Sequence, residues 1–391
     1  MKRCDGRKSC CPLRRWAKRF FVGLLVFLVL AVPIVYLGAP KVGRTEWAKT
    51  RAEREASKAL GMPVNIQRME FSWSEGITAH DVRTGPMDFG DMQARWTASE
   101  VQLKIKSSEL LSRHPKGTAI LRRPTMEMKW REETAPPRAI PPASPSLARG
   151  RFQSLQLYGF VVERGSVLID NPSFGNPVRI DDIQAAGELD ARRDHVDLTV
   201  SAFSAKLNDG TVSARGKLEI RKSEANGRIS LGCDDVDVNQ FVVKSIRNLQ
   251  PMIEVEDGGV QKGKLQVRLD GQGTAGSLGS LLDAFRGQGQ INLSSAAIHR
   301  SRLMHAVGDH AGLPYLVTTS FHTLTESFTL ESGKFTIASE AKASEGSLLV
   351  AGWVALTGEL DILVGLDPRL GQGPRAPARV TGTVSHPEAV R

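Results

Sequence analysis

A glycine-rich stretch, GQGTAG (residues 271–276), has the residue types and spacing of a cofactor site. It fits the Gly-x-Gly-x-x-Gly pattern with which a strand–turn–helix unit binds the pyrophosphate of NAD or FAD. The segment before it, Lys264–Asp270, alternates polar and apolar residues, whereas a buried parallel strand would be apolar throughout. The acid expected about 20 residues downstream to bind a ribose is also absent. We therefore interpret GQGTAG as a flexible turn between a strand and a helix, so that Gly271→Ala should hardly affect ligand binding.

Other candidate catalytic and metal-binding residues are dispersed. Histidines gather between residues 299 and 322, but no two are spaced i, i+4 on one helix face, which leaves both a zinc site and ordinary surface histidines open. The group comprises His299, His305, His310 and His322, with Asp309 among them. The nucleophile, zinc-protease and phosphate-loop motifs are all missing from the sequence. The residues predict a protein that is not an enzyme and holds no cofactor or metal.

The net charge of +10 is concentrated at the N-terminus. Residues 1–19 hold eight Lys or Arg against the single Asp5, which gives +7 and leaves +3 for the rest of the chain. No domain-scale basic face is implied, and nucleic-acid binding is disfavoured. Residues 1–19 are instead expected to be a basic cytoplasmic tail.

An uncharged apolar segment follows the tail at residues 20–40. Its length suits a helix that crosses the ~30 Å hydrocarbon core of a bilayer. The cations before it place the N-terminus in the cytoplasm, and the bulk of the chain on the other side. A cleaved signal peptide is the alternative. Cys233 is the single cysteine beyond this segment, so an internal disulfide framework is excluded there.

The rest of the chain predicts a mainly β protein. Residues 41–62 have the spacing of a linker helix, and beyond them a period of two residues dominates, with turn signals between the alternating runs. We expect a long, curled antiparallel sheet with a few short helices, divided into an N-terminal β region (63–131) and a C-terminal β region (151–391). The proline-rich residues 132–150 are either a linker between domains or an insertion between two strands of one sheet. The apolar strand faces must form a sandwich, a barrel or an open trough.

Several segments resemble the AsmA family of bacterial envelope proteins, which is related to the TamB type of lipid-transfer protein. GMPVNIQRMEFSWSEGITAHDVR (residues 61–83) is similar to the helix, strand, Trp-containing turn and strand that follow the family's membrane anchor. Residues 277–308 resemble its C-terminal helix–Gly–strand–helix unit. Residues 321–337 and 346–366 resemble its closing strands, and VTGTVSHPE its last strand.

The resemblance implies a single-pass protein of the bacterial inner membrane whose periplasmic sheet forms an apolar groove for phospholipid or another envelope lipid. It also implies a part in lipid transport and envelope maintenance, with other envelope proteins as possible partners. The alternative is an assembly or scaffolding protein that binds proteins and no lipid. An anchored oxidoreductase that uses GQGTAG is a third and weaker hypothesis.

The candidate groove residues are the apolar positions of three alternating strands, and a predicted helix over residues 277–286 would cover the groove through its apolar face. The groove candidates are Val101, Leu103, Ile105, Leu265, Val267, Leu269, Leu360, Ile362 and Val364, and the helix candidates are Leu278, Leu281, Leu282 and Phe285.

Overall fold

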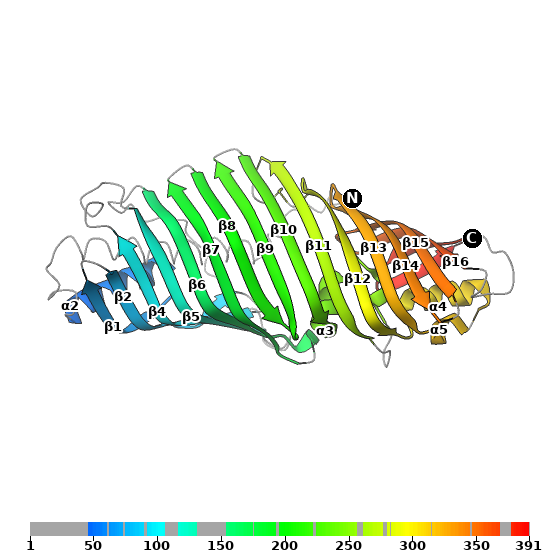
Figure 1. Cartoon of the computed structure of the whole chain (residues 1–391), viewed down its shortest axis with the longest axis horizontal. Helices are drawn as coiled ribbons and strands as arrows, with labels where there is room; N and C mark the ends of the chain where they lie inside the picture. The colour runs from blue at the N-terminus through cyan, green and yellow to red at the C-terminus, as the bar shows by residue number, and fades with distance from the viewer. Residues whose placement is uncertain are drawn as a thin grey trace, which may run out of the picture. The chain divides into compact units, whose positions relative to one another are not determined.

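A computed structural model gives the fold of the chain (Figure 1). It describes residues 46–60, 62–72, 75–89, 92–105, 116–130, 154–174, 176–192, 195–221, 224–255, 261–276, 280–281, 283–313, 315–344, 346–367 and 377–390. The predicted tail (1–19), membrane helix (20–40) and proline-rich segment (132–150) lie outside these residues. Among the helices that are described, none is both long and apolar enough to cross a bilayer.

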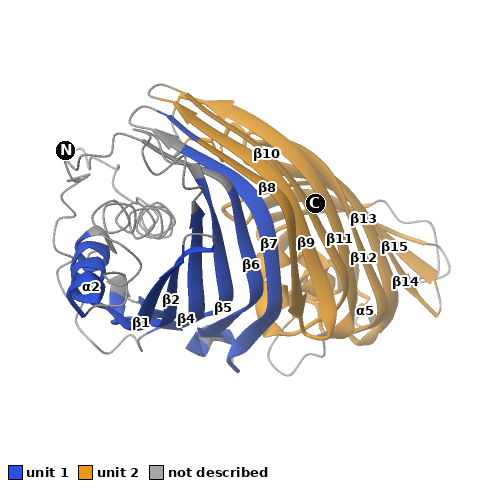
Figure 2. Ribbon diagram, turned by 60° about the vertical axis from the view of Figure 1, so that its left-hand side comes forward, with its two compact units in different colours: residues 1–196 blue, residues 197–391 orange. Residues whose placement is uncertain are grey.

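The described part of the chain is mainly β, with few helices, and it divides into two compact units at Val196 (Figure 2). The strands form an open mixed sheet, and in neither unit do the described strands close into a barrel. This confirms the predicted class and the scarcity of helices. The prediction of a purely antiparallel sheet was wrong, for a reason found in the first unit.

The first described element of the first unit (1–196) is helix α2, Glu46–Leu60, which lies within the residues predicted to be helical. Strands β1 (Val64–Ser72) and β2 (Gly76–Thr84) follow as an antiparallel hairpin. The outer edge of β1 meets α2, because the backbone N–H of Val64 donates to Ser57 Oγ (2.9 Å) and that of Ile66 to Glu53 Oε1 (2.8 Å). Side chains of the helix thus satisfy edge donors that could otherwise recruit another strand.

The remaining strands of this unit include one parallel pair. β4 pairs antiparallel with β2, β3 and β5, and β6 pairs antiparallel with β7. Strands β5 and β6, in contrast, run parallel. A parallel connection needs a dozen or more residues to return to the starting edge, and the segment between Trp130 and Ser154 supplies them. The proline-rich residues thus connect two adjacent strands of one unit. The strands are β3 (Met87–Phe89), β4 (Met92–Ile105), β5 (Lys116–Trp130), β6 (Ser154–Asp170) and β7 (Val178–Arg192), with a short 3-10 turn, η1 (Pro172–Phe174), between the last two.

The second unit (197–391) is an antiparallel meander. From β9 onward each strand pairs with the next along the chain, as Figure 1 shows for the row from β9 to β16. VTGTVSHPE forms parts of two strands, β17 and β18, where one was expected. The strands are β8 (His195–Leu207), β9 (Gly210–Arg221), β10 (Glu224–Asp237), β11 (Gln261–Ala275), β12 (Arg286–Ile298), β13 (Phe321–Glu331), β14 (Lys334–Ala343), β15 (Gly346–Ala355), β16 (Glu359–Leu366), β17 (Ala378–Thr383) and β18 (His386–Val390).

Short helices accompany the C-terminal strands of this unit and contribute to a closed core. They are α3 (Gln240–Ile246), η2 (Pro251–Ile253), α4 (Arg302–Ala311) and α5 (Tyr315–Thr318). Gly312 ends α4 in the left-handed region, with φ of 66°. Met252, Met304 and Leu316 are at most 1% exposed, as are Leu324 on β13 and Val380 on β17. The apolar side chains that β13 to β16 contribute to this core are therefore packed against protein.

Candidate functional site

The apolar face of β9, β10 and β11 is only half-covered, unlike the C-terminal core. Leu218, Ile229, Leu231 and Leu269 are neither buried nor fully exposed. Side chains directly opposite each other across strands share one face, so these residues form a continuous apolar surface. We name it the β9–β11 apolar face. Its rows are Ala214–Leu231–Leu269, Gly216–Ile229–Gly271 and Leu218–Gly227–Gly273.

The glycines of this face admit side chains from the segment that follows β11. A Cβ at Gly227 would lie 3.0 Å from Leu281 Cδ2, and one at Gly273 would lie 3.1 Å from Phe285 Cα. A Cβ at Gly271 would overlap the Phe285 ring. Leu281 is buried and Phe285 half-buried, so the two residues cover the glycine-rich end of the face.

GQGTAG is therefore part of a strand, and its interpretation as a turn was wrong. Residues 271–275 belong to β11, which pairs antiparallel with β10 and β12. Gly271 and Gly273 lie on the apolar face, while Gln272 and Thr274 point to the polar face. The strand–loop–helix geometry of a dinucleotide site is not formed here. A Cβ at Gly271 would nevertheless require the Phe285 ring to move, while the expected effect of Gly271→Ala on ligand binding stays a prediction.

None of the described residues within the predicted helix over 277–286 is helical. Ser280, Leu281, Asp283 and Ala284 form turns, held by one bond from the Ala284 N–H to the Ser280 carbonyl (3.1 Å). Arg286 already belongs to β12, where it lies opposite Gln272 of β11. Leu278 and Leu282, two of the proposed covering residues, lie outside the described residues.

The first unit has a comparable gradient of exposure on its own apolar face. Ala119, Leu121 and Met126 of β5 are buried. The residues opposite them on β6 are half-buried, and so are Ala185 and Ile180 in the same rows on β7. The face is therefore packed at one side and partly open at β6 and β7. Its rows are Ala119–Phe160–Gly187, Leu121–Val162–Ala185 and Met126–Val167–Ile180.

The predicted groove residues fall into different environments. Leu269 lies on the half-covered β9–β11 apolar face, and the side chain of Ile105 lies outside the described residues. The other seven are buried, at 8% exposure or less: Val101, Leu103, Leu265, Val267, Leu360, Ile362 and Val364. The alternating pattern thus predicted which side of each strand is apolar, but not which part of that side meets solvent.

A buried carboxylate went unnoticed in the sequence. Glu326 of β13 is 3% exposed and occupies an apolar-phase position between Leu324 and Phe328. Ser339 Oγ donates a short hydrogen bond to Glu326 Oε2, and Gln250 Nε2 donates a second one (2.8 Å). Glu326 Oε1 has no hydrogen-bond partner in the described part of the chain. Burial raises the pKa of Glu326 to about 8, despite the opposing hydrogen bond from Ser339. An acid within the alternating run FHTLTESFTL was the signal that could have revealed it.

The histidines and Cys233 do not form a centre. Asp309 Oδ2 lies 3.3 Å from His305 Nε2, one turn away on α4, and His322 Nε2 lies 2.9 Å from Ser344 Oγ. Over the residues that the structure describes, no three potential metal ligands come together. Cys233 is buried on β10, and burial raises the pKa of its thiol to about 11.

The half-covered apolar faces are thus the candidate sites for a ligand, one in each unit. No protein-family model and no curated protein matches this chain.

Proposed function

We propose that the chain is a membrane-anchored, non-enzymatic protein of the AsmA type that binds or transfers lipid in the bacterial envelope. The observation that carries the proposal is the β9–β11 apolar face, where large aliphatic side chains remain half-exposed beside glycines. Each CH₂ group that moves from water onto such a surface contributes about 0.8 kcal/mol, so an acyl chain is a fitting ligand. The resemblance to AsmA proteins and the apolar segment at residues 20–40 support the same assignment.

Glycines give this face the shape that an extended chain requires. Gly216 and Gly271 flank Ile229 directly, and Leu218 and Gly273 flank Gly227. Side chains of the protein fill the space at Gly227, Gly271 and Gly273, so an acyl chain would lie on the half-exposed aliphatic residues beside these glycines. Leu281 and Phe285 already occupy part of this space, and they would cover one end of a bound acyl chain.

The test uses two neighbouring residues of β10 that point to opposite faces. Ile229 lies on the apolar face, and Ser230 lies on the polar face between Arg215 and Asp270. The full chain, purified in detergent, is analysed by mass spectrometry for co-extracted phospholipid. Ile229→Asp should lose the lipid, because a carboxylate would have to be desolvated against an acyl chain. Ser230→Asp should retain it.

A photocrosslinking residue at either position separates loss of binding from loss of folding. The otherwise wild-type chain with a benzophenone side chain at position 229 should form a lipid adduct. The same side chain at position 230 should form none. Absence of phospholipid from the wild-type protein, or equal adducts at both positions, would contradict the proposal.

A second candidate function is the scaffolding of other envelope proteins. It is favoured by a pair of exposed apolar residues on the face of β15 and β16 that points away from the buried core. Leu349 of β15 and Leu363 of β16 are 55% and 49% exposed, respectively. Ala351 lies between them in the strand register, opposite Leu363. Exposed aliphatic residues that adjoin in this way are typical of protein contacts. Crosslinking from position 349 to a specific protein, together with a lipid-free wild-type chain, would favour this function over lipid binding.

A further inference from the structure

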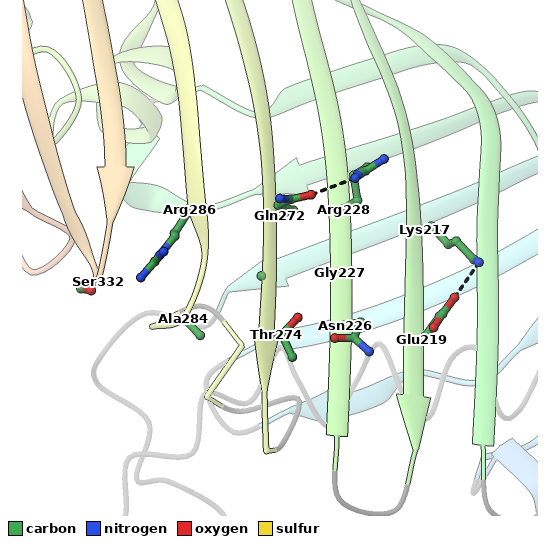
Figure 3. Close-up of a pocket in the computed structure, with 11 residues that line it drawn as sticks. Lys217, Glu219, Asn226, Gly227, Arg228, Gln272, Thr274, Ala284, Arg286 and Ser332 are labelled. Carbon is green, nitrogen blue, oxygen red and sulfur yellow. Dashed lines mark hydrogen bonds and ion pairs between the residues drawn. The ribbon is translucent and has the colours of Figure 1, made fainter.

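A polar hollow in the second unit lies on the face of β9–β12 that is opposite the β9–β11 apolar face. Its volume is about 630 Å³, and its side chains come from four adjacent strands and the turns beside them (Figure 3). Its lining residues include Lys217, Asn226, Arg228, Gln272, Thr274 and Arg286.

Strand register places three cations of the hollow in one row. Lys217 of β9 lies opposite Arg228 of β10, which lies opposite Gln272 of β11, and Gln272 lies opposite Arg286 of β12. Adjacent strands are about 4.8 Å apart, so the row spans about 15 Å. All four side chains are exposed, and Figure 3 shows them along the same side of the sheet.

Cations outnumber acids among the residues that line the hollow. Glu219 pairs with Lys217, and its hydrogen bond raises the pKa of that ammonium group, which therefore stays protonated. Arg286 Nη2 lies 3.2 Å from Glu331 Oε1, at the edge of the hollow. Arg228 Nη2 instead donates to a neutral acceptor, Gln272 Oε1 (2.9 Å). Glu219 is the one acid among the lining residues, against three cations.

A second row supplies neutral donors next to the cations. Asn226 lies opposite Thr274, two residues along from Arg228 and Gln272 on the same strands. An amide and a hydroxyl group therefore adjoin the guanidinium of Arg228, whose planar fork of N–H groups matches a phosphate. Charge-assisted hydrogen bonds of this kind are the strong ones in anion recognition.

We propose that this hollow is a binding site for a phosphoryl oxyanion, with Arg228 at its centre and Lys217 and Arg286 on either side. The ligand is either a free phosphate compound or the phosphodiester headgroup of an anionic lipid, which present the same oxygens. The site does not depend on the lipid-binding function, because it lies on the other face of the strands.

The experiment is a calorimetric titration of the full chain in a non-ionic detergent. The probes are inorganic pyrophosphate and the short-chain lipid dihexanoylphosphatidylglycerol. Arg228→Gln removes one charge from the centre of the row. Arg215→Gln is the matched control, because Arg215 lies on the same face of β9, is exposed and does not line the hollow.

Saturable binding of either probe should weaken about tenfold in Arg228→Gln, as expected for the loss of a charge-assisted hydrogen bond, and hardly change in Arg215→Gln. Binding of pyrophosphate would identify a free phosphate as the ligand, and binding of the lipid alone would identify a headgroup. No saturable binding of either probe, or equal weakening by both substitutions, would overturn the proposal. Ile229→Asp should leave this titration unchanged, which separates it from the test of acyl-chain binding.

Discussion

Glu326 makes the stability of the second unit depend on pH in an unusual direction. Its folded-state pKa of about 8 lies above the ordinary value of 4.5, so the folded protein retains a proton that the unfolded chain releases. The contribution of Glu326 to the free energy of unfolding is therefore fully present below pH 4.5, falls as the pH rises, and is lost above pH 8. The residues around it carry no charge that could compensate: Ile291 and Ser339 lie opposite it, and Gln250 is its other partner.

The size of the effect follows from the difference between the two pKa values. A shift of one unit corresponds to about 1.4 kcal/mol. Integrated between pH 5 and pH 8, the shift of Glu326 should lower the free energy of unfolding by about 3 to 4 kcal/mol. This is a large part of the stability of an ordinary domain.

Glu326→Gln should remove this pH dependence. The amide oxygen can accept the hydrogen bonds from Ser339 and Gln250, and the amide nitrogen replaces Oε1, which has no partner among the described residues. We expect the variant to be more stable than the wild type at pH 8. Trp353, the one tryptophan of residues 197–391, reports unfolding of this unit once the other tryptophans are replaced by phenylalanine. Urea midpoints are then compared from pH 5 to pH 9.

The control is Glu340→Gln, on the residue beside Ser339 that points to the other face of β14 and pairs with Lys342 at the surface. This variant should follow the wild-type pH profile. If Glu326→Gln shows the same slope as the wild type between pH 5 and pH 8, the carboxyl is already ionised in the folded state and the reasoning fails.

Two further predictions concern packing and the sheet edge. Gly271→Ala should displace Phe285 and destabilise the second unit by about 1 to 3 kcal/mol, whereas Gly365→Ala, whose Cβ would lie 3.9 Å from Leu349 Cβ, should be neutral in the same urea assay. A Gly271→Ala variant that is as stable as the wild type would contradict this prediction, because it would show that the Phe285 ring can move without cost. Replacing Glu53 and Ser57 by Ala should expose the donors of Val64 and Ile66 and promote self-association, which sedimentation velocity measures. Lys58→Ala, on the exposed side of α2, should stay unassociated, and an unassociated double variant would contradict the role given to these side chains.

The alternating pattern sufficed to predict the strands because each face of a pleated strand meets one environment. Leu360, Ile362 and Val364 were assigned to an inward face correctly in phase, yet they are buried in a closed core. Period-two alternation separates two faces but does not reveal what covers them. That depends on segments far along the chain, such as α4, which packs against β17 and β18 although no local pattern connects it with them.

GQGTAG shows why the glycines were misinterpreted. In a sequence, glycines suggest a turn because of their backbone freedom, but Gly271 and Gly273 serve here through the side chain they lack. Glycine is needed at these positions because Phe285 and Leu281 occupy the space of a side chain. The positions of these two residues depend in turn on how the hairpin closes. The parallel pairing of β5 and β6 could not be predicted either. The long proline-rich segment indicated a break between strands, but not the direction in which the next strand runs.

The order of pairing in the second unit has a consequence for how the chain folds. From β9 to β18 every strand pairs with the strand just synthesised, so each hairpin can form as soon as its second strand is available. In the first unit β6 must wait until the whole segment after Trp130 has emerged before it can align with β5. The parallel pair is thus one step at which an incomplete chain would expose the edge of β5, and where a holding chaperone would have an unpaired edge to protect.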